Sequence, residues 1–275
     1  MLTETAKYIG RLAPSPTGLL HVGHAATFWT AYERAQQHDG TLLLRNEDLD
    51  PQRSKSEFAE AMIEDLAWLG ITWTPPMIVQ SERLALYREA FEQLLAAGLV
   101  YPCTCSRREL ALMIAAPHED TDDEPVYSGR CRPAIGASLA FEPDRNYRFR
   151  VPDGETIQFI DGNLGAHNFT AGADFGDFLV WRKDGLPSYQ LACVVDDAAM
   201  RISEAVRGAD LLKSTARQIL LQRALGLPAI SYFHTGLLRD DHGIRLAKRH
   251  DALAIRTLRE RGMQPAEVLA LGRNS

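Results

Sequence analysis

The sequence has only 4 cysteines among 275 residues, no long apolar run and no large excess of one charge. Four cysteines in a chain of this length do not form a disulfide scaffold. No apolar run approaches the ~18 residues of a transmembrane helix. The first residues, MLTETAKYIG, lack the basic and apolar regions of a signal peptide. We therefore expect a soluble, cytoplasmic protein that does not associate with membranes.

The composition is that of an ordinary globular protein. Hydrophobic residues make up 45% and charged residues 24%, which excludes a disordered, collagen-like or coiled-coil chain. The 30 Lys and Arg against 36 Asp and Glu give a formal charge of −6, which argues against nonspecific binding of nucleic acid by charge alone. At about 150 residues per domain, the length predicts one large domain or two modest ones.

Strand and helix patterns alternate in the first 100 residues. Residues 7–13 and 41–45 have the composition of short strands, and a helical pattern lies between them. A second helix follows, where Ser54 and Glu57 have the spacing of a capping box. Strand, helix, strand, helix is typical of a parallel sheet with crossover helices, so we predict an α/β fold.

The remainder divides into three segments. Residues 81–97 predict a helix, and residues 101–150, where prolines and cysteines gather, predict an inserted subdomain with a solvated acidic loop at 118–124. The parallel pattern then resumes, Asp210 is expected to cap an amphipathic helix, and two short helices finish the chain. The strands expected in this half are 157–160, 178–181 and 202–207. The predicted division is 1–100 and 151–238 for the two halves of a catalytic domain, 101–150 for the insertion, and 239–275 for the C-terminal end.

The segment from Arg11 to His24 has the character of a phosphate site. A predicted strand passes into a turn fixed by proline and glycine, and a helix begins at His21 and His24. A helix N-terminus exposes unpaired N–H groups and a partial positive charge, which suit a triphosphate. Gly23 leaves room for an adenine ring, and the histidines could donate to phosphate oxygens. Taken alone, two histidines at a helix start are more often polar caps.

Charged residues at strand ends suggest an amino-acid site nearby. Arg11 and Arg207 are permanently charged groups suited to binding carboxylates through two hydrogen bonds. Glu47 could accept from an ammonium group. A carboxylate clamp and an ammonium acceptor are what an amino acid requires, although scattered surface ion pairs explain such residues equally well.

Several blocks in order resemble one family. Residues 13–24, APSPTGLLHVGH, resemble the HIGH signature of the class I aminoacyl-tRNA synthetases in the form used by glutamyl enzymes. RNEDLDPQRS at 45–54 resembles the next motif of that family, and GIRLAKRHD at 243–251 falls where its KMSKS loop belongs. Further similar blocks are 184–191, 206–212 and 214–218. Together the matches run from about residue 8 to 260.

Within this family, the sequence resembles one branch more than the others. Glutamyl-tRNA synthetases continue beyond the KMSKS loop into a helical domain that reads the anticodon, whereas this sequence ends about 26 residues after Arg249. That shape is similar to the truncated, glutamyl-Q branch of the family. The resemblance implies a class I, Rossmann-like nucleotide-binding fold with an inserted zinc-binding subdomain, a short helical C-terminal end and no anticodon-binding domain. We also expect a monomer.

The resemblance implies an ATP-dependent ligase. Glutamate is activated, without tRNA, to glutamyl-adenylate, and is then transferred to queuosine in the anticodon stem-loop of tRNA(Asp). The implied ligands are L-glutamate and ATP with Mg²⁺. Glutamate contacts carry over to Arg11, Leu12, Ala13, Pro14, Ser15, Glu47, Tyr189 and Arg207. ATP contacts carry over to His21, Gly23, His24 and Lys248, of which His21, His24 and Lys248 are the expected catalytic groups.

The cysteines are a possible metal site. Cys103 and Cys105, separated by one residue, are reduced thiols available to a metal, although spacing of this kind more often reflects buried or incidental cysteines. The resemblance implies a structural zinc ion held by Cys103, Cys105, Tyr127 and Cys131. Cys193, in the apolar stretch LACVV, is expected to be a small core residue.

Three residues depart from the family pattern, and three alternative functions remain open. Arg245 and Ala247 replace a lysine and a serine of the KMSKS loop, and Glu204 stands where histidine is common. The alternatives are a minimal synthetase that charges tRNA(Glu), a non-catalytic amino-acid or ATP sensor, and a zinc-dependent nucleic-acid-binding module. Basic residues in 207–217 and 245–261 are our candidates for the tRNA surface.

Overall fold

A parallel sheet forms the first half of the protein. The structure is a computed structural model that describes residues 7–105, 126–134, 140–238 and 253–273. Its first sheet has the parallel order β1-β2-β3, with Ile9 opposite Thr41 and Leu12 opposite Leu44. The elements are β1 (Ile9–Leu12), α1 (Val22–Gln37), β2 (Thr41–Asn46), α2 (Ser56–Trp68) and β3 (Thr74–Val79). The predicted parallel pairing with crossover helices is confirmed.

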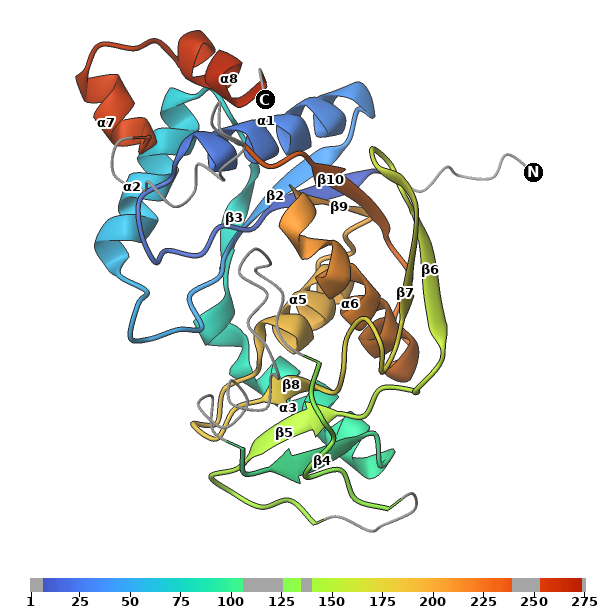
Figure 1. Cartoon of the computed structure of the whole chain (residues 1–275). Coiled ribbons are helices and arrows are strands. Elements are labelled where there is room, and N and C mark those ends of the chain that lie inside the picture. Colours follow the sequence, from blue (N-terminus) through green and yellow to red (C-terminus); the bar gives the residue numbers. More distant parts are fainter. Residues whose placement is uncertain (1–6, 106–125, 135–139, 239–252, 274–275) are drawn as a thin grey trace.

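A second sheet continues the first. Its order is β7-β6-β10-β9, in which β10 pairs in parallel with β6 and β9, while β6 and β7 form an antiparallel hairpin. β9 lies beside β1, where the Ser203 N–H donates to the Ile9 carbonyl at 2.8 Å. The strands are β6 (Thr156–Asp161), β7 (Gly165–Thr170), β9 (Glu204–Gly208) and β10 (Ser231–Thr235), accompanied by α5 (Tyr189–Ala199) and α6 (Leu212–Ala224). Figure 1 shows the β6–β7 hairpin along one side of the molecule.

A small antiparallel sheet lies at the end of the molecule opposite α7 (Ile255–Glu260) and α8 (Pro265–Arg273) (Figure 1). It consists of β4 (Val100–Cys103), β5 (Asn146–Phe149) and β8 (Phe178–Trp181), beside α3 (Leu84–Ala96). The strand predicted at 178–181 exists, but the expectation that it belongs to the parallel sheet is wrong. The cause is packing, because Phe178 stacks on Phe149 at 5.4 Å and Trp181 on Phe91 at 4.9 Å between ring centroids.

Two helix starts differ from the prediction. The capping box at Ser54 and Glu57 is wrong, because α2 begins at Ser56 and its N-cap, Lys55, makes no side-chain cap bond. A turn closed by the Asp50 carbonyl, which accepts from the Ser54 N–H at 2.8 Å, occupies the preceding residues. Asp210 does not cap α6 either. It lies inside a short 3-10 helix, Ala209–Leu211, and Leu211 is the N-cap.

Strand alternation sorts the side chains of β1 and β2 onto two faces. Leu12 and Leu44 are fully buried in a hydrophobic cluster with residues of α1, α2, α7 and α8. A second cluster joins residues of α3, α5 and α6 with the small sheet. Arg11 and Arg45 point to this second side, where both contact Asp197 of α5.

None of the described helices is long and apolar enough to cross a membrane.

The structure gives Glu204, a departure from the family pattern, a defined role. Arg34 of α1 donates from Nε and Nη2 to the two carboxylate oxygens of Glu204 at 2.5 and 2.6 Å. The Tyr8 hydroxyl donates to the same group at 2.8 Å. The Glu204 carboxylate therefore joins α1, β9 and the residue preceding β1.

We expect Glu204→Gln to lower the free energy of unfolding by about 1–3 kcal/mol, because a charge-assisted pair is replaced by a neutral amide. Urea denaturation of both proteins measures the difference. Glu60→Gln, on the exposed face of α2, is the matched control and should change stability by less than about 0.5 kcal/mol. Equal stability of the two variants would contradict this role.

Candidate active site

A cleft of about 860 Å³ opens where the parallel strands end. Its walls come from the residues after β1 and β2, the end of β9 and the residues after β10, together with the start of α1. In open parallel sheets, ligands bind outside the carboxyl ends of the strands, where the strand order changes direction. Here that point lies between β1 and β9, because β2 continues the sheet to one side of β1 and β10 continues it beyond β9.

The cleft brings together most of the residues expected from the sequence. Its lining includes Arg11, Ala13, Pro14, Ser15, His21, Gly23, His24, Glu47, Tyr189 and Arg207. Leu12 is not part of the lining and is fully buried in the hydrophobic cluster beneath α1. Lys248 lies outside the described residues, as do Arg245 and Ala247. The described residues on either side of that segment, Leu238 and Leu253, both line the cleft.

Two buried arginines share one carboxylate on the floor of the site. Asp197 accepts from Arg45 Nη1 at 2.6 Å and from Arg11 Nε at 3.4 Å. Burial alone would raise the pKa of Asp197, but the two guanidinium groups lower it below its usual value. Arg45 Nη2 also donates to Glu47 Oε1 at 2.8 Å, so buried Arg45 and Asp197 connect two charged residues of the cleft lining, Arg11 and Glu47, in one network.

Arg207 lies in a separate polar cage. Its Nη2 donates to Thr215 Oγ1 at 2.7 Å, its Nη1 to Gln218 Oε1 at 2.8 Å and its Nε to His234 Nε2 at 3.3 Å. Thr215 and Gln218 come from α6, and His234 comes from β10. The guanidinium is buried, and these three hydrogen bonds fix its plane at the end of β9.

The two histidines at the start of α1 cap the helix reciprocally. His21 Nδ1 accepts from the Gly23 N–H at 3.1 Å, His24 Nδ1 accepts from the His21 N–H at 3.2 Å, and the rings stack at 3.8 Å. A Cβ at Gly23 would lie 2.9 Å from His21 Cε1, so this position requires glycine for the capping arrangement itself. The expectation that these two histidines are polar caps is correct, and both residues also line the cleft.

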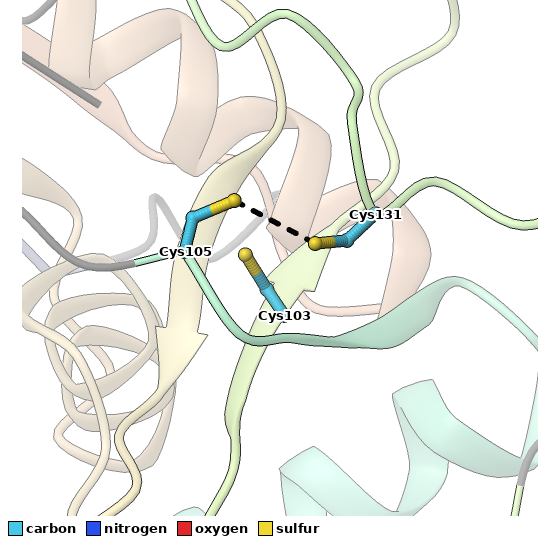
Figure 2. Close-up of side chains that lie close together, drawn as sticks. All are labelled: Cys103, Cys105 and Cys131. Carbon is cyan, nitrogen blue, oxygen red and sulfur yellow. Dashed lines mark hydrogen bonds between the residues drawn. The ribbon is translucent and has the colours of Figure 1, made fainter. Parts of the chain in front are cut away.

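Three cysteine sulfurs meet between β4 and the chain that precedes β5. Figure 2 shows Cys103, Cys105 and Cys131 converging, with the sulfurs of Cys105 and Cys131 3.6 Å apart, and all three lie within 4.8 Å of one another. The Tyr127 hydroxyl lies 3.6 Å from the sulfurs of both Cys103 and Cys105. All three cysteines are free thiols, so the cluster can bind a metal ion.

These distances fit tetrahedral zinc. Zn–S bonds of about 2.3 Å place sulfur atoms about 3.8 Å apart on the edges of a tetrahedron. Arg148 adds positive charge, because its Nε donates to Cys103 Sγ at 3.3 Å and its guanidinium lies 4.2 Å from the centre of the Tyr127 ring. Thiolate and phenolate ligands are stabilised by such a neighbour.

The sequence reasoning missed the buried partners of the arginines. Asp196 and Asp197 stand together in the apolar stretch LACVVDDAA, and buried carboxylates need cationic or hydrogen-bonding partners. Two adjacent aspartates in an apolar stretch therefore indicate buried carboxylates whose partners could have been sought among the arginines. Thr215 and Gln218 lie in the similar block 214–218, but their contacts with Arg207, like that of His234, depend on how α6, β9 and β10 pack together. Cys193 is buried as predicted, and its thiol also lies 3.5 Å from Glu47 Oε1.

Comparisons with known proteins agree with this geometry. The model of the family described as "tRNA synthetases class I (E and Q), catalytic domain" matches residues 8–273. The glutamyl-Q tRNA(Asp) synthetase of Symbiobacterium thermophilum is 45% identical over 94% of this chain and 84% of that protein. The protein of the same name from Rhodobacter capsulatus is 42% identical over 96% of this chain and 99% of its own.

A solved structure shows the same fold. A glutamate tRNA ligase from Elizabethkingia meningosepticum, in complex with its amino acid, superposes with a TM-score of 0.75 at 31% identity. The match covers 88% of this chain and 52% of the ligase, so the chain spans about half the length of that protein. The chain belongs to the class I aminoacyl-tRNA synthetases of the E and Q type and, within them, to the glutamyl-Q tRNA(Asp) synthetase family.

Proposed function

We propose that this chain activates L-glutamate with ATP to glutamyl-adenylate, without tRNA, and then transfers the glutamyl group to queuosine in the anticodon of tRNA(Asp). The observation that carries the first step is one cleft whose lining brings together Arg11, Arg207, Glu47 and the histidine-capped start of α1. The tRNA specificity is supported by the family to which the chain belongs. We place the enzyme in the cytoplasm, where tRNA and ATP are available.

The amino acid is bound by groups of opposite charge. A guanidinium has five N–H donors, and Arg11 uses two of them for Asp197 and the Val206 carbonyl, so donors remain for a carboxylate. Arg207 supplies a second cation whose plane is fixed. Glu47 accepts the substrate ammonium group. Tyr189, at the start of α5 and 41% exposed, contributes hydroxyl and ring contacts.

The start of α1 and the segment after β10 bind ATP. Adenylate formation is an in-line attack of the glutamate carboxylate on the α-phosphorus, so the protein supplies position and positive charge and no nucleophile of its own. His21 and His24 stand at the positive end of the α1 dipole. Lys248 neutralises the departing pyrophosphate, and Mg²⁺ that enters with ATP would offset further negative charge on the phosphates.

The cysteine cluster holds one structural zinc ion in this proposal. Cys103, Cys105, Tyr127 and Cys131 provide four ligands, which close the coordination sphere and leave no position for a substrate. The ion would tie β4 to residues 127–131 and thereby pin the segment 101–150.

The acceptor is tested with purified protein, labelled glutamate and ATP, using tRNA(Asp) with and without queuosine. We expect acid-precipitable label only with the queuosine-containing tRNA, because the base supplies the hydroxyl acceptor. Label on tRNA(Glu) would instead make the protein a minimal synthetase. Glutamate-dependent pyrophosphate exchange without any labelled tRNA would show that the acceptor is misassigned.

We expect Lys248→Ala to lower kcat for glutamate-dependent ATP–pyrophosphate exchange by about 100-fold, because a cation facing the leaving group acts mainly in the transition state. Lys183→Ala, at an exposed position after β8, is the matched control and should retain full exchange. Unchanged exchange in Lys248→Ala would contradict the assignment of the ATP site.

Metal analysis of the purified protein should give about one zinc ion per chain, as expected for one closed four-ligand site. Cys131→Ser should lose most of this zinc, because an alcohol is a far poorer ligand than a thiolate. Cys193→Ser removes a thiol outside the cluster and should keep the zinc. Equal zinc content in both variants would exclude the cluster as the binding site.

A further inference from the structure

His234 lies behind Arg207, on the side away from the cleft. The histidine side chain is fully buried, and it does not line the cleft, whereas Arg207 does. His234 Nε2 lies 3.3 Å from Arg207 Nε and 3.1 Å from Thr215 Oγ1. His234 is therefore in direct contact with an arginine of the site without facing the substrate space.

Asp161 determines which nitrogen of His234 carries the proton. Its Oδ2 lies 2.6 Å from His234 Nδ1, and the carboxylate also accepts from the backbone N–H groups of His234, Asn163 and Leu164. Burial would raise the pKa of Asp161, but these hydrogen bonds lower it, so the group is an anion that accepts the Nδ1 proton. Nε2 is then left with its lone pair.

The imidazole is neutral under ordinary conditions. Burial, followed by the nearby Arg207 guanidinium, lowers the pKa of His234 to about 4. A protonated ring would place a second positive charge against Arg207. In the neutral ring, Nε2 can accept the Nε–H of Arg207, which neither Thr215 nor Gln218 contacts.

We propose that His234 is a positioning residue for glutamate binding: its Nε2 lone pair fixes the Nε end of Arg207, so that the guanidinium directs its remaining N–H donors at a substrate carboxylate. This inference rests on the proposed function. Thr215 and Gln218 hold the two terminal nitrogens from α6, and His234 holds the third nitrogen from β10. Three anchors on two elements leave the guanidinium no free rotation.

The histidine offers a pair of substitutions that separate its two nitrogens. Asn places an amide near the Nδ1 position, so His234→Asn keeps a partner for Asp161 and removes the acceptor at Arg207. Gln reaches the Nε2 position, so His234→Gln restores an acceptor at Arg207 and gives up the bond to Asp161. His38→Asn, on an exposed histidine at the end of α1, is the matched control.

The measurements are the KM values for glutamate and ATP in pyrophosphate exchange and the calorimetric Kd for glutamate. We expect His234→Asn to raise the KM and the Kd for glutamate by about tenfold, with kcat and the KM for ATP within twofold of wild type. His234→Gln should restore most of the glutamate affinity, although its Tm is lower. His38→Asn should match wild type throughout.

A glutamate KM within twofold of wild type in folded His234→Asn would overturn the inference. Equal increases in both KM values would also overturn it, because they indicate a general structural role. Should His234→Asn fail to fold, His234→Gln decides alone, and a tenfold higher glutamate KM in that variant refutes the role of Nε2. Absence of glutamate-dependent exchange in wild type would instead refute the proposed function.

Discussion

The carboxylate of Asp197 is the contact on which the proposed glutamate site depends. It holds Arg11 of β1 and Arg45 of β2 from one position on α5, so the two strand ends and the helix are fixed relative to one another. Without an anion there, two guanidinium groups less than 5% exposed would repel each other in a medium of low dielectric. The binding surface of the cleft therefore depends on Asp197 balancing the charges of the two arginines beneath it.

The same network reaches well beyond the cleft. Asp196, the neighbour of Asp197, accepts from Gln80 Nε2 at 2.8 Å, from Arg83 Nε at 2.7 Å and from the Tyr87 hydroxyl at 2.8 Å. Both carboxylates form ion pairs with Arg45, Asp196 at 3.8 Å and Asp197 at 2.6 Å, and Asp196 in addition holds the start of α3. The small sheet and α3 beside it are attached to α5 through these polar contacts as well as through a shared hydrophobic core.

Much of this could be predicted from the sequence. The parallel pairing of β1 with β2 follows from alternating apolar runs and helix patterns, and the motif residues at the strand ends meet because parallel strands end at one edge. The sheet to which residues 178–181 belong could not be predicted, because an apolar tetrapeptide fits either partner and only Phe149 and Phe91 decide. The cage around Arg207 was equally hidden, since Asp161, Thr215 and His234 are far apart in the chain. Leu12 shows the limit of such a resemblance, because a glutamate contact was expected there and its side chain is buried in the core instead.

Asp161 joins the outer hairpin to the amino-acid site. Its carboxylate closes the turn between β6 and β7 through the N–H groups of Asn163 and Leu164 and holds the His234 ring at the same time. Ile160 beside it is 81% exposed, so the hairpin meets solvent one residue from a buried anion. The turn and the cage around Arg207 therefore share one carboxylate, so a substitution of Asp161 would remove hydrogen bonds from the β6–β7 turn and from the His234 ring at the same time.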